Sequence, residues 1–345
     1  MSPNTRTEHA ITCPQCNAPL APHRFARNIV CPYCGTTVQL DETAVSASIF
    51  HDALRAWNSP STVRSASWIT IRDHHWELER FIANGEISDV YFARRARWPT
   101  ELAVLKLLRD PKNADLFNNE WESLKVLQQS NAPGADTFTS LIPQPIMKGE
   151  ATGGTNASKR VNVFRRPIGF KHTLEEVRKV YPQGIPPRAS VWIWRRILEV
   201  LAFIHGSGMV HVGIVPSNLL IQENEHGILI VGYSCAGRQG EKLRKISSRF
   251  ESFYPRHTLS SLKLTAQADL AMSARCIVAV LGGNPATAAL PNSVPQKLAT
   301  VIQRIALIDA GDRIHEDAWT IREELGKIAE DVFGTPQFIP IVMPS

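Results

Sequence analysis

From residue 76 onward, hydrophobic and polar positions follow two different periods along the chain. The first part has mainly the two-residue period of β-strands, interrupted by one helical stripe in which Trp121, Leu124 and Leu127 recur. We expect strands at 77–82, 90–96, 102–108, 142–147 and 161–165, and a helix at 117–129. After residue 166 the helical period dominates, and we expect helices at 174–180, 188–205, 266–281, 295–307 and 317–333. A β-rich part followed by a helical part predicts an α+β fold with two lobes.

The first 75 residues have a different texture. Short β-prone runs surround two cysteine turns, and a weaker helical pattern follows until a proline-containing break at 58–62 ends it. These changes divide the whole chain into a tail at 1–10, a small β module at 11–40, a linker with a short helix at 41–75, two lobes at 76–170 and 171–335, and a second tail at 336–345.

Four of the six cysteines form two Cys-x-x-Cys turns that are separated by fourteen residues. Zn²⁺ takes four ligands in a tetrahedron, and each turn supplies two thiolates to one side of it. A redox pair needs only one such turn in a βαβ setting, which the sequence lacks. The module is similar to the zinc-ribbon family, and the pattern predicts a structural Zn²⁺ bound by Cys13, Cys16, Cys31 and Cys34. Whether the ribbon also binds DNA, RNA or a protein stays open.

Composition narrows the class of protein. The net charge of +6 and the pI near 9.1 permit an acidic partner but do not by themselves indicate one. The polar first ten residues lack the apolar core of a signal peptide. The longest apolar stretches, such as 276–281, are far shorter than the roughly 18 residues of a membrane span. We therefore expect a cytoplasmic protein with neither a membrane nor a nucleic-acid partner.

Motifs suited to phosphate binding lie in the β-rich part. Small residues in a hairpin let backbone N–H groups close over a phosphate, and the candidates are Ala83, Gly85 and Ser88, followed by Val90. The strand Ala103-Val104-Leu105-Lys106 comes next, and Glu120 lies fourteen positions after the lysine. This order resembles the glycine-rich loop, lysine strand and glutamate helix of the protein-kinase family. The resemblance implies a Lys106–Glu120 ion pair, a five-stranded N-lobe with Lys106 on its third strand, and a weak site for ATP.

The helical part contains the most informative segment of that resemblance. His211, Pro216 and Asn218 match the kinase pattern His-Arg-Asp-Leu-x-Pro-x-Asn, but Val212 replaces the arginine and Gly213 the catalytic aspartate. In the family that aspartate accepts the proton of the substrate hydroxyl, and glycine has no group that could do so.

Three later landmarks also bear on the resemblance. The Mg²⁺-binding Asp-Phe-Gly triplet is expected within 227–237, but no Asp or Glu occurs from 226 to 240, so its register stays open. Asp269 matches the buried aspartate that braces the catalytic loop. Arg313 matches an arginine that pairs with the glutamate of an Ala-Pro-Glu motif, yet Arg256 stands at that glutamate's place. The anchor of the segment before Arg256 must therefore differ.

Together these features predict a pseudokinase that regulates or scaffolds a protein partner and keeps at most weak, Mg²⁺-independent nucleotide binding. Residues 238–263 carry seven Lys or Arg against two Glu, which indicates either a solvated loop or a docking surface for an acidic partner. The alternative is an atypical serine/threonine kinase that binds ATP at the same lysine, glutamate and asparagine. It would take its missing acid from Glu223 or Glu225.

Overall fold

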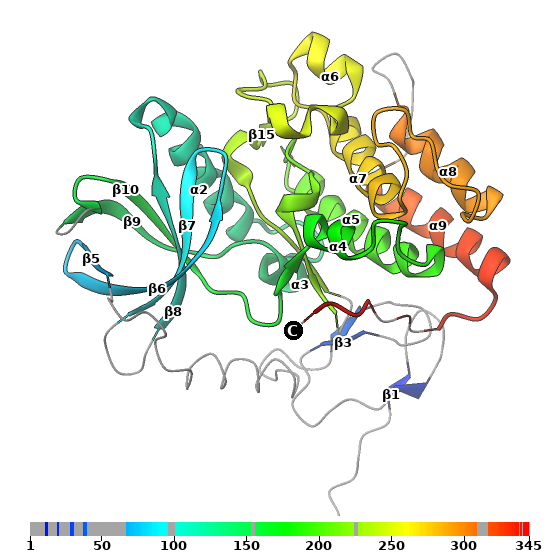
Figure 1. Cartoon of the computed structure of the whole chain (residues 1–345), viewed down its shortest axis with the longest axis horizontal. Coiled ribbons are helices and arrows are strands. Elements are labelled where there is room, and N and C mark those ends of the chain that lie inside the picture. The colour runs from blue at the N-terminus through cyan, green and yellow to red at the C-terminus, as the bar shows by residue number, and fades with distance from the viewer. Residues whose placement is uncertain are drawn as a thin grey trace, which may run out of the picture.

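A β-rich lobe and a helical lobe lie side by side in the computed structural model (Figure 1). The structure describes residues 11–12, 19–20, 28–30, 37–39, 67–95, 101–152, 156–223, 227–308, 317–337, 339 and 341–344. The predicted two-lobed α+β arrangement is confirmed.

Six antiparallel strands of the first lobe close into a barrel in the order β10–β8–β7–β6–β5–β9. Their bounds are β5 Ser67–Ile71, β6 His74–Asn84, β7 Ser88–Arg95, β8 Glu101–Leu108, β9 Pro145–Thr152 and β10 Arg160–Arg165. The core is formed by inward side chains of alternating positions, among them Trp76, Leu105 and Val163, which are fully buried. Helix α2, Ala114–Gln128, lies between the barrel and the second lobe.

Two predictions for this lobe are wrong. Strand β5 lies in the segment that we assigned to the linker, and the barrel has six strands where five were expected. Ile69 and Ile71 are fully buried while Trp68 is exposed, so the strand has the expected alternation, but over only five residues. Because β5 comes first, Lys106 on β8 lies on the fourth barrel strand in chain order, the third counted from β6.

The second lobe is built around one buried helix, α5, which packs against α7, α9 and strand β14. The long helices are α4 Leu174–Val180, α5 Pro187–Gly206, α7 Ala266–Val280, α8 Gln296–Ala306 and α9 Ala318–Phe333. Each lies within one residue of its predicted ends. Capping side chains explain where two of these helices begin. Thr173 and Glu176 form a capping box at the start of α4, and the Asp317 side chain caps the start of α9. None of the helices in the described ranges is long and apolar enough to cross a bilayer.

Short strands complete the second lobe. Strands β11 His172–Thr173, β13 Leu219–Gln222 and β14 Gly227–Ile230 form one sheet, and β12 Met209–Val210 pairs with β15 Gly237–Arg238. The last described residues also pack against the second lobe. Ile341 and Met343 are buried, and the Tyr181 hydroxyl donates to the Val342 carbonyl at 2.9 Å.

Two small antiparallel hairpins precede the lobes. Strands β1 Ile11–Thr12 and β2 Pro19–Leu20 flank the first cysteine turn, and β3 Asn28–Val30 and β4 Thr37–Gln39 flank the second. The four cysteines lie outside the described residues, as do the predicted helix between 44 and 57, Glu225 and Arg313. The zinc site therefore stays a prediction.

Candidate functional site

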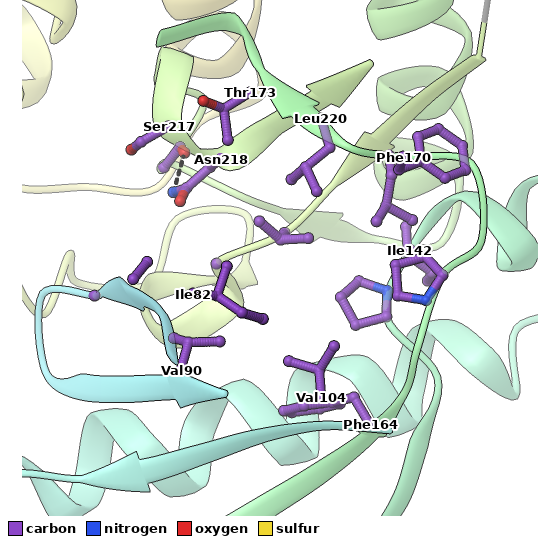
Figure 2. Close-up of a pocket in the computed structure, with 18 of the residues that line it drawn as sticks. Ile82, Val90, Val104, Ile142, Phe164, Phe170, Thr173, Ser217, Asn218 and Leu220 are labelled. Carbon is purple, nitrogen blue, oxygen red and sulfur yellow. Dashed lines mark hydrogen bonds between the residues drawn. The ribbon is translucent and has the colours of Figure 1, made fainter. Parts of the chain in front are cut away.

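A cleft with a cavity volume of about 1520 Å³ lies between the lobes. Figure 2 shows its apolar walls, with Ile82 and Val90 on the β6–β7 hairpin, Val104 and Phe164 on the barrel, and Leu220 on β13. The structure brings all of the predicted nucleotide-site positions to this cleft: Ala83, Gly85, Ser88, Val90, Lys106, Glu120 and Asn218. Gly213, at the place of the missing catalytic base, lines it too. That they bind a nucleotide stays a prediction.

The predicted ion pair is present. Lys106 Nζ lies 2.6 Å from Glu120 Oε1, and the glutamate is almost fully buried on α2. The same carboxylate oxygen accepts the backbone N–H of Tyr233 at 3.3 Å. Asn119, one residue before, donates to the carbonyls of Ser234 and Ala236 at 2.9 and 2.7 Å. Helix α2 is thus fixed to the barrel on one side and to residues 233–236 on the other.

The β6–β7 turn, which matches the glycine-rich loop, is held in place by a residue that sequence reasoning missed. The Arg109 guanidinium donates to the carbonyls of Gly85 and Glu86 and, at 2.8 Å, to the Asn84 side chain. Ile87 at the tip is buried against α2, and the Arg109 N–H donates to its carbonyl at 3.1 Å. A turn fixed in this way is not free to close down over a phosphate.

The catalytic-loop region is braced as the resemblance implied. Asp269, fully buried at the start of α7, accepts the N–H of His211 at 2.8 Å and the N–H of Val212 at 2.6 Å. Its carboxylate also lies 3.0 Å from His205 Nε2. Burial lowers the pKa of His211 to about 4, so the imidazole is neutral at physiological pH. The His211 Nδ1 atom accepts the Gly213 N–H at 3.1 Å, which orients the loop at the position of the missing acid.

The structure also gives the register that the sequence left open. Gly232 lies directly against Asn218, since a Cβ on it would come between 2.5 and 2.9 Å from the asparagine side chain. The next residue, Tyr233, is fully buried with its ring edge-on to His211, at 4.3 Å between centroids. In kinases the triplet aspartate and the catalytic-loop asparagine hold Mg²⁺ together. Gly232 therefore lies where the resemblance implies the aspartate of the triplet.

Asn218 itself is engaged in the fold. Its side-chain Nδ2 donates to the Gly213 carbonyl at 2.9 Å, and its backbone carbonyl accepts the Val231 N–H at 2.9 Å. Glu223 lies beyond the other end of β13, where its carboxylate is 3.2 Å from His172 Nε2. Five residues of extended chain span about 16 Å, so Glu223 is far from Gly232 along the sheet.

Arg275 replaces the anchor that the sequence could not identify. From α7 it donates to the carbonyls of Ser252 and Tyr254, at 3.1 and 2.8 Å, and to the Ala306 carbonyl at 2.9 Å. The segment before Arg256 is thus held through its backbone and needs no acidic partner. The signal for Arg275 in the sequence is that it is the only basic residue of an otherwise mainly apolar helix.

The basic segment lies across the mouth of the cleft from the β6–β7 turn. Lys245 Nζ is 3.6 Å from Glu86 Oε1. The segment folds back on itself, so that the backbones of Lys242 and Lys263 form an antiparallel β-bridge. The two cysteines of this lobe, Cys235 and Cys276, have thiol pKa values raised by burial, so neither is a reactive thiolate.

Comparison with solved structures places this geometry among known folds. The BubR1 kinase domain superposes with a TM-score of 0.56 and 15% identity, over 82% of this chain and 90% of that one. A rhoptry kinase from Toxoplasma gondii superposes with a TM-score of 0.58 and 14% identity, over 81% of this chain and 88% of that one. No family model and no curated protein matches the chain by sequence. Over about four fifths of its length, the chain therefore has a protein-kinase-like fold.

Proposed function

We propose that the chain is a pseudokinase, a catalytically inactive regulatory or scaffold protein with a structural zinc ribbon. The observation that carries this proposal is the presence of two glycines, Gly213 and Gly232, on either side of Asn218. Both stand where phosphoryl transfer requires a carboxylate.

The two losses affect different steps of the reaction. A kinase needs a base that positions the substrate hydroxyl and a metal that bridges the phosphates. Gly213 has no side chain to accept a proton, and general base catalysis alone contributes about 10²–10⁴-fold. Mg²⁺ prefers carboxylate oxygens, and the described residues contain no group of three or more His, Cys, Asp or Glu side chains that could hold a metal ion. The described residues therefore do not fit a magnesium ion, although Lys106 leaves a cation for Mg²⁺-independent, weak nucleotide binding.

The position of Glu223 argues against the alternative of an atypical kinase. Its carboxylate is paired with His172 at the far end of β13, and so it is not available beside Asn218 as a metal ligand. Glu225 lies outside the described residues. The position of Glu223 thus gives no support to the atypical kinase, and Glu225 does not bear on it.

The remaining parts of the proposal concern partners. A four-cysteine zinc site leaves no open position on the metal, so the ribbon would have a structural role or bind a protein. The segment 238–263 would contact an acidic protein surface. Lys242 and Lys263 lie opposite each other in an antiparallel backbone bridge, and a negatively charged partner would reduce the repulsion between their like charges. We place this protein in the cytoplasm, with no nucleic-acid or membrane partner.

The test is transfer of labelled γ-phosphate from ATP to the protein itself and to generic substrates, with Mg²⁺ or Mn²⁺. We expect no labelling above a Lys106→Met control. Because Lys106→Met leaves Glu120 buried without its cation, the double variant Lys106→Met/Glu120→Gln serves as a second control, and circular dichroism checks that both fold. Labelling that disappears in both folded controls would refute the proposal. ATP titrations should give the same weak affinity with and without Mg²⁺.

A further inference from the structure

A row of side chains crosses three strands of the barrel on the face that borders the cleft. Arg80 on β6 lies opposite Phe92 on β7, and Phe92 lies opposite Val104 on β8. All three line the cavity, as does Arg166, the residue that follows β10. The row therefore leads from an apolar wall at Val104 to an exposed arginine on β6.

Two guanidinium groups lie against the same aromatic ring. The Cζ atom of Arg166 is 3.9 Å from the ring centroid of Phe92, and the Cζ atom of Arg80 is 5.0 Å from it. The face of an aromatic ring attracts a cation, and this contact uses none of the five N–H donors of a guanidinium group. The ring thus holds two like charges close together and leaves their donors to an acceptor.

The carboxylate beside these arginines does not balance their charge. Glu79 Oε2 lies 3.4 Å from Arg166, while Glu79 Oε1 lies 2.6 Å from Arg94, and Glu79 does not line the cavity. Burial lowers the pKa of Arg166, Glu79 opposes this effect, and the charges of Arg80 and Arg94 lower the pKa further. Within the described residues, Arg80 forms neither an ion pair nor a hydrogen bond. Arg166 thus shares its carboxylate with Arg94, and Arg80 has none.

The cavity as a whole favours a negatively charged ligand. The described residues that line it include nine Lys or Arg but only five Asp or Glu. Next to the row, Val104 and Phe164 on the barrel face Leu220 on the opposite side and give apolar surfaces for a flat ring (Figure 2). Such walls hold an apolar body, and a few placed polar groups then fix its orientation. A ligand with an apolar ring and an anionic group matches this arrangement.

We propose that Arg80 and Arg166 form an oxyanion site beside the apolar walls of the cleft, and that this site binds the carboxylate or phosphate group of a small aromatic acid. Guanidinium groups bind both oxyanions through paired N–H donors. The site is separate from Lys106, which lies opposite Val90 in another row. Two strands and two residues along a strand separate Lys106 from Arg80, which corresponds to about 12 Å between their Cα atoms. The inference goes beyond the proposed function and does not depend on whether the chain transfers phosphate.

Isothermal titration calorimetry on the full chain compares two anionic probes, 2-naphthoate and 2-naphthyl phosphate, with neutral 2-naphthamide. The three share one ring system, so their affinities differ through the attached group. At low salt we expect at least one anion to bind about tenfold more tightly than the amide, and the tighter anion identifies the preferred oxyanion. Arg80→Gln and Arg166→Gln should each reduce this preference at least about threefold. Both variants should fold, because Arg80 has no described ion-pair partner and Glu79 keeps Arg94 when Arg166 is replaced.

Arg160→Gln is the matched control, since it removes an exposed arginine of β10 that does not line the cavity, and it should keep the full preference. Equal binding of the amide and both anions to the unaltered protein would overturn the proposal. So would the absence of binding by all three probes up to their solubility limits. A loss of preference in Arg160→Gln as large as in Arg80→Gln would overturn it too, because net charge alone would then explain the result. The labelling assay tests phosphate transfer separately, so the two proposals fail independently.

Discussion

Asp269 should be the side chain on which the catalytic-loop region depends most. Its carboxylate is fully buried and accepts two backbone N–H groups, from His211 and Val212, at 2.8 and 2.6 Å. Val212 has a φ of 47°, in the left-handed region that costs a non-glycine residue about 1–2 kcal/mol. The carboxylate therefore holds a strained, buried peptide in place, and Asp269→Ala would remove both acceptors.

The magnitude follows from the bonds that are lost. Hydrogen bonds to a charged acceptor contribute about 1.5–3 kcal/mol each, so losing two should lower the free energy of unfolding by about 3–6 kcal/mol. Asp269→Asn keeps one oxygen acceptor but turns an amide N–H group towards a backbone donor, and it should cost about half as much. For a lobe of this size, 3–6 kcal/mol corresponds to a fall in Tm on the order of 10 °C.

Urea denaturation and differential scanning calorimetry on the full chain measure the effect. The matched control is Asp136→Asn, which changes an exposed carboxylate between α2 and β9 and should alter stability by less than about 0.5 kcal/mol. A loss below about 1 kcal/mol for Asp269→Ala would refute the reasoning. It would mean that the two N–H groups find other acceptors and that the loop does not depend on this carboxylate.

Four further predictions test other parts of the structure. Gly232→Asp should lower the free energy of unfolding by more than Gly213→Asp, because at 232 φ is 87° and a Cβ would lie within 3 Å of the Asn218 side chain, whereas at 213 the nearest atoms are those of His211 at 3.1 Å or more; urea denaturation compares the two. Tyr233→Phe should raise Tm by a few degrees, since its buried hydroxyl bonds to no described residue, and a fall would contradict this. Since the pKa of His211 is about 4 when folded and 6.5 when unfolded, the unfolded chain binds more protons below pH 6.5. Stability should thus fall by about 3 kcal/mol from pH 6.5 to 4, but not in His211→Gln. The purified protein should hold one zinc by elemental analysis, and Cys13→Ser should lose it.

The fold was largely predictable because its long elements repeat a period many times. Helix α5, for example, keeps its apolar stripe for 20 residues and was placed to within one residue at each end. Strand β5 was missed for the opposite reason. Its two buried positions, Ile69 and Ile71, give only one repeat of the strand period, too few to separate a strand from a linker.

The candidate site was predictable where a side chain meets another side chain at a spacing known for the family. Lys106 with Glu120 is such a case. Arg109 and Arg275 were missed because they bind backbone carbonyls, and a carbonyl leaves no mark in the sequence. The place that the resemblance implies for the triplet could not be fixed from the sequence, since no acidic residue marks it between 226 and 240. The contact of Gly232 with Asn218 indicates the register.

The polar residues that this cleft keeps have a purely structural explanation. Glu120 is buried, and removing its partner Lys106 would leave an uncompensated carboxylate at a cost of about 3–5 kcal/mol. Asp269 braces two peptides, and Asn218 bonds the Gly213 carbonyl. Each would be retained for folding even if no phosphate were ever transferred.

Carboxylates at positions 213 and 232 would have no comparable structural role. They would stand beside Asn218 at the cleft, where without a bound metal two negative charges would repel each other and any phosphate. Glycine at both places removes that repulsion. It also gives up the ligands for Mg²⁺ and the base for the hydroxyl. If the proposed function is right, the pattern separates residues that the fold requires from residues that only phosphoryl transfer would require.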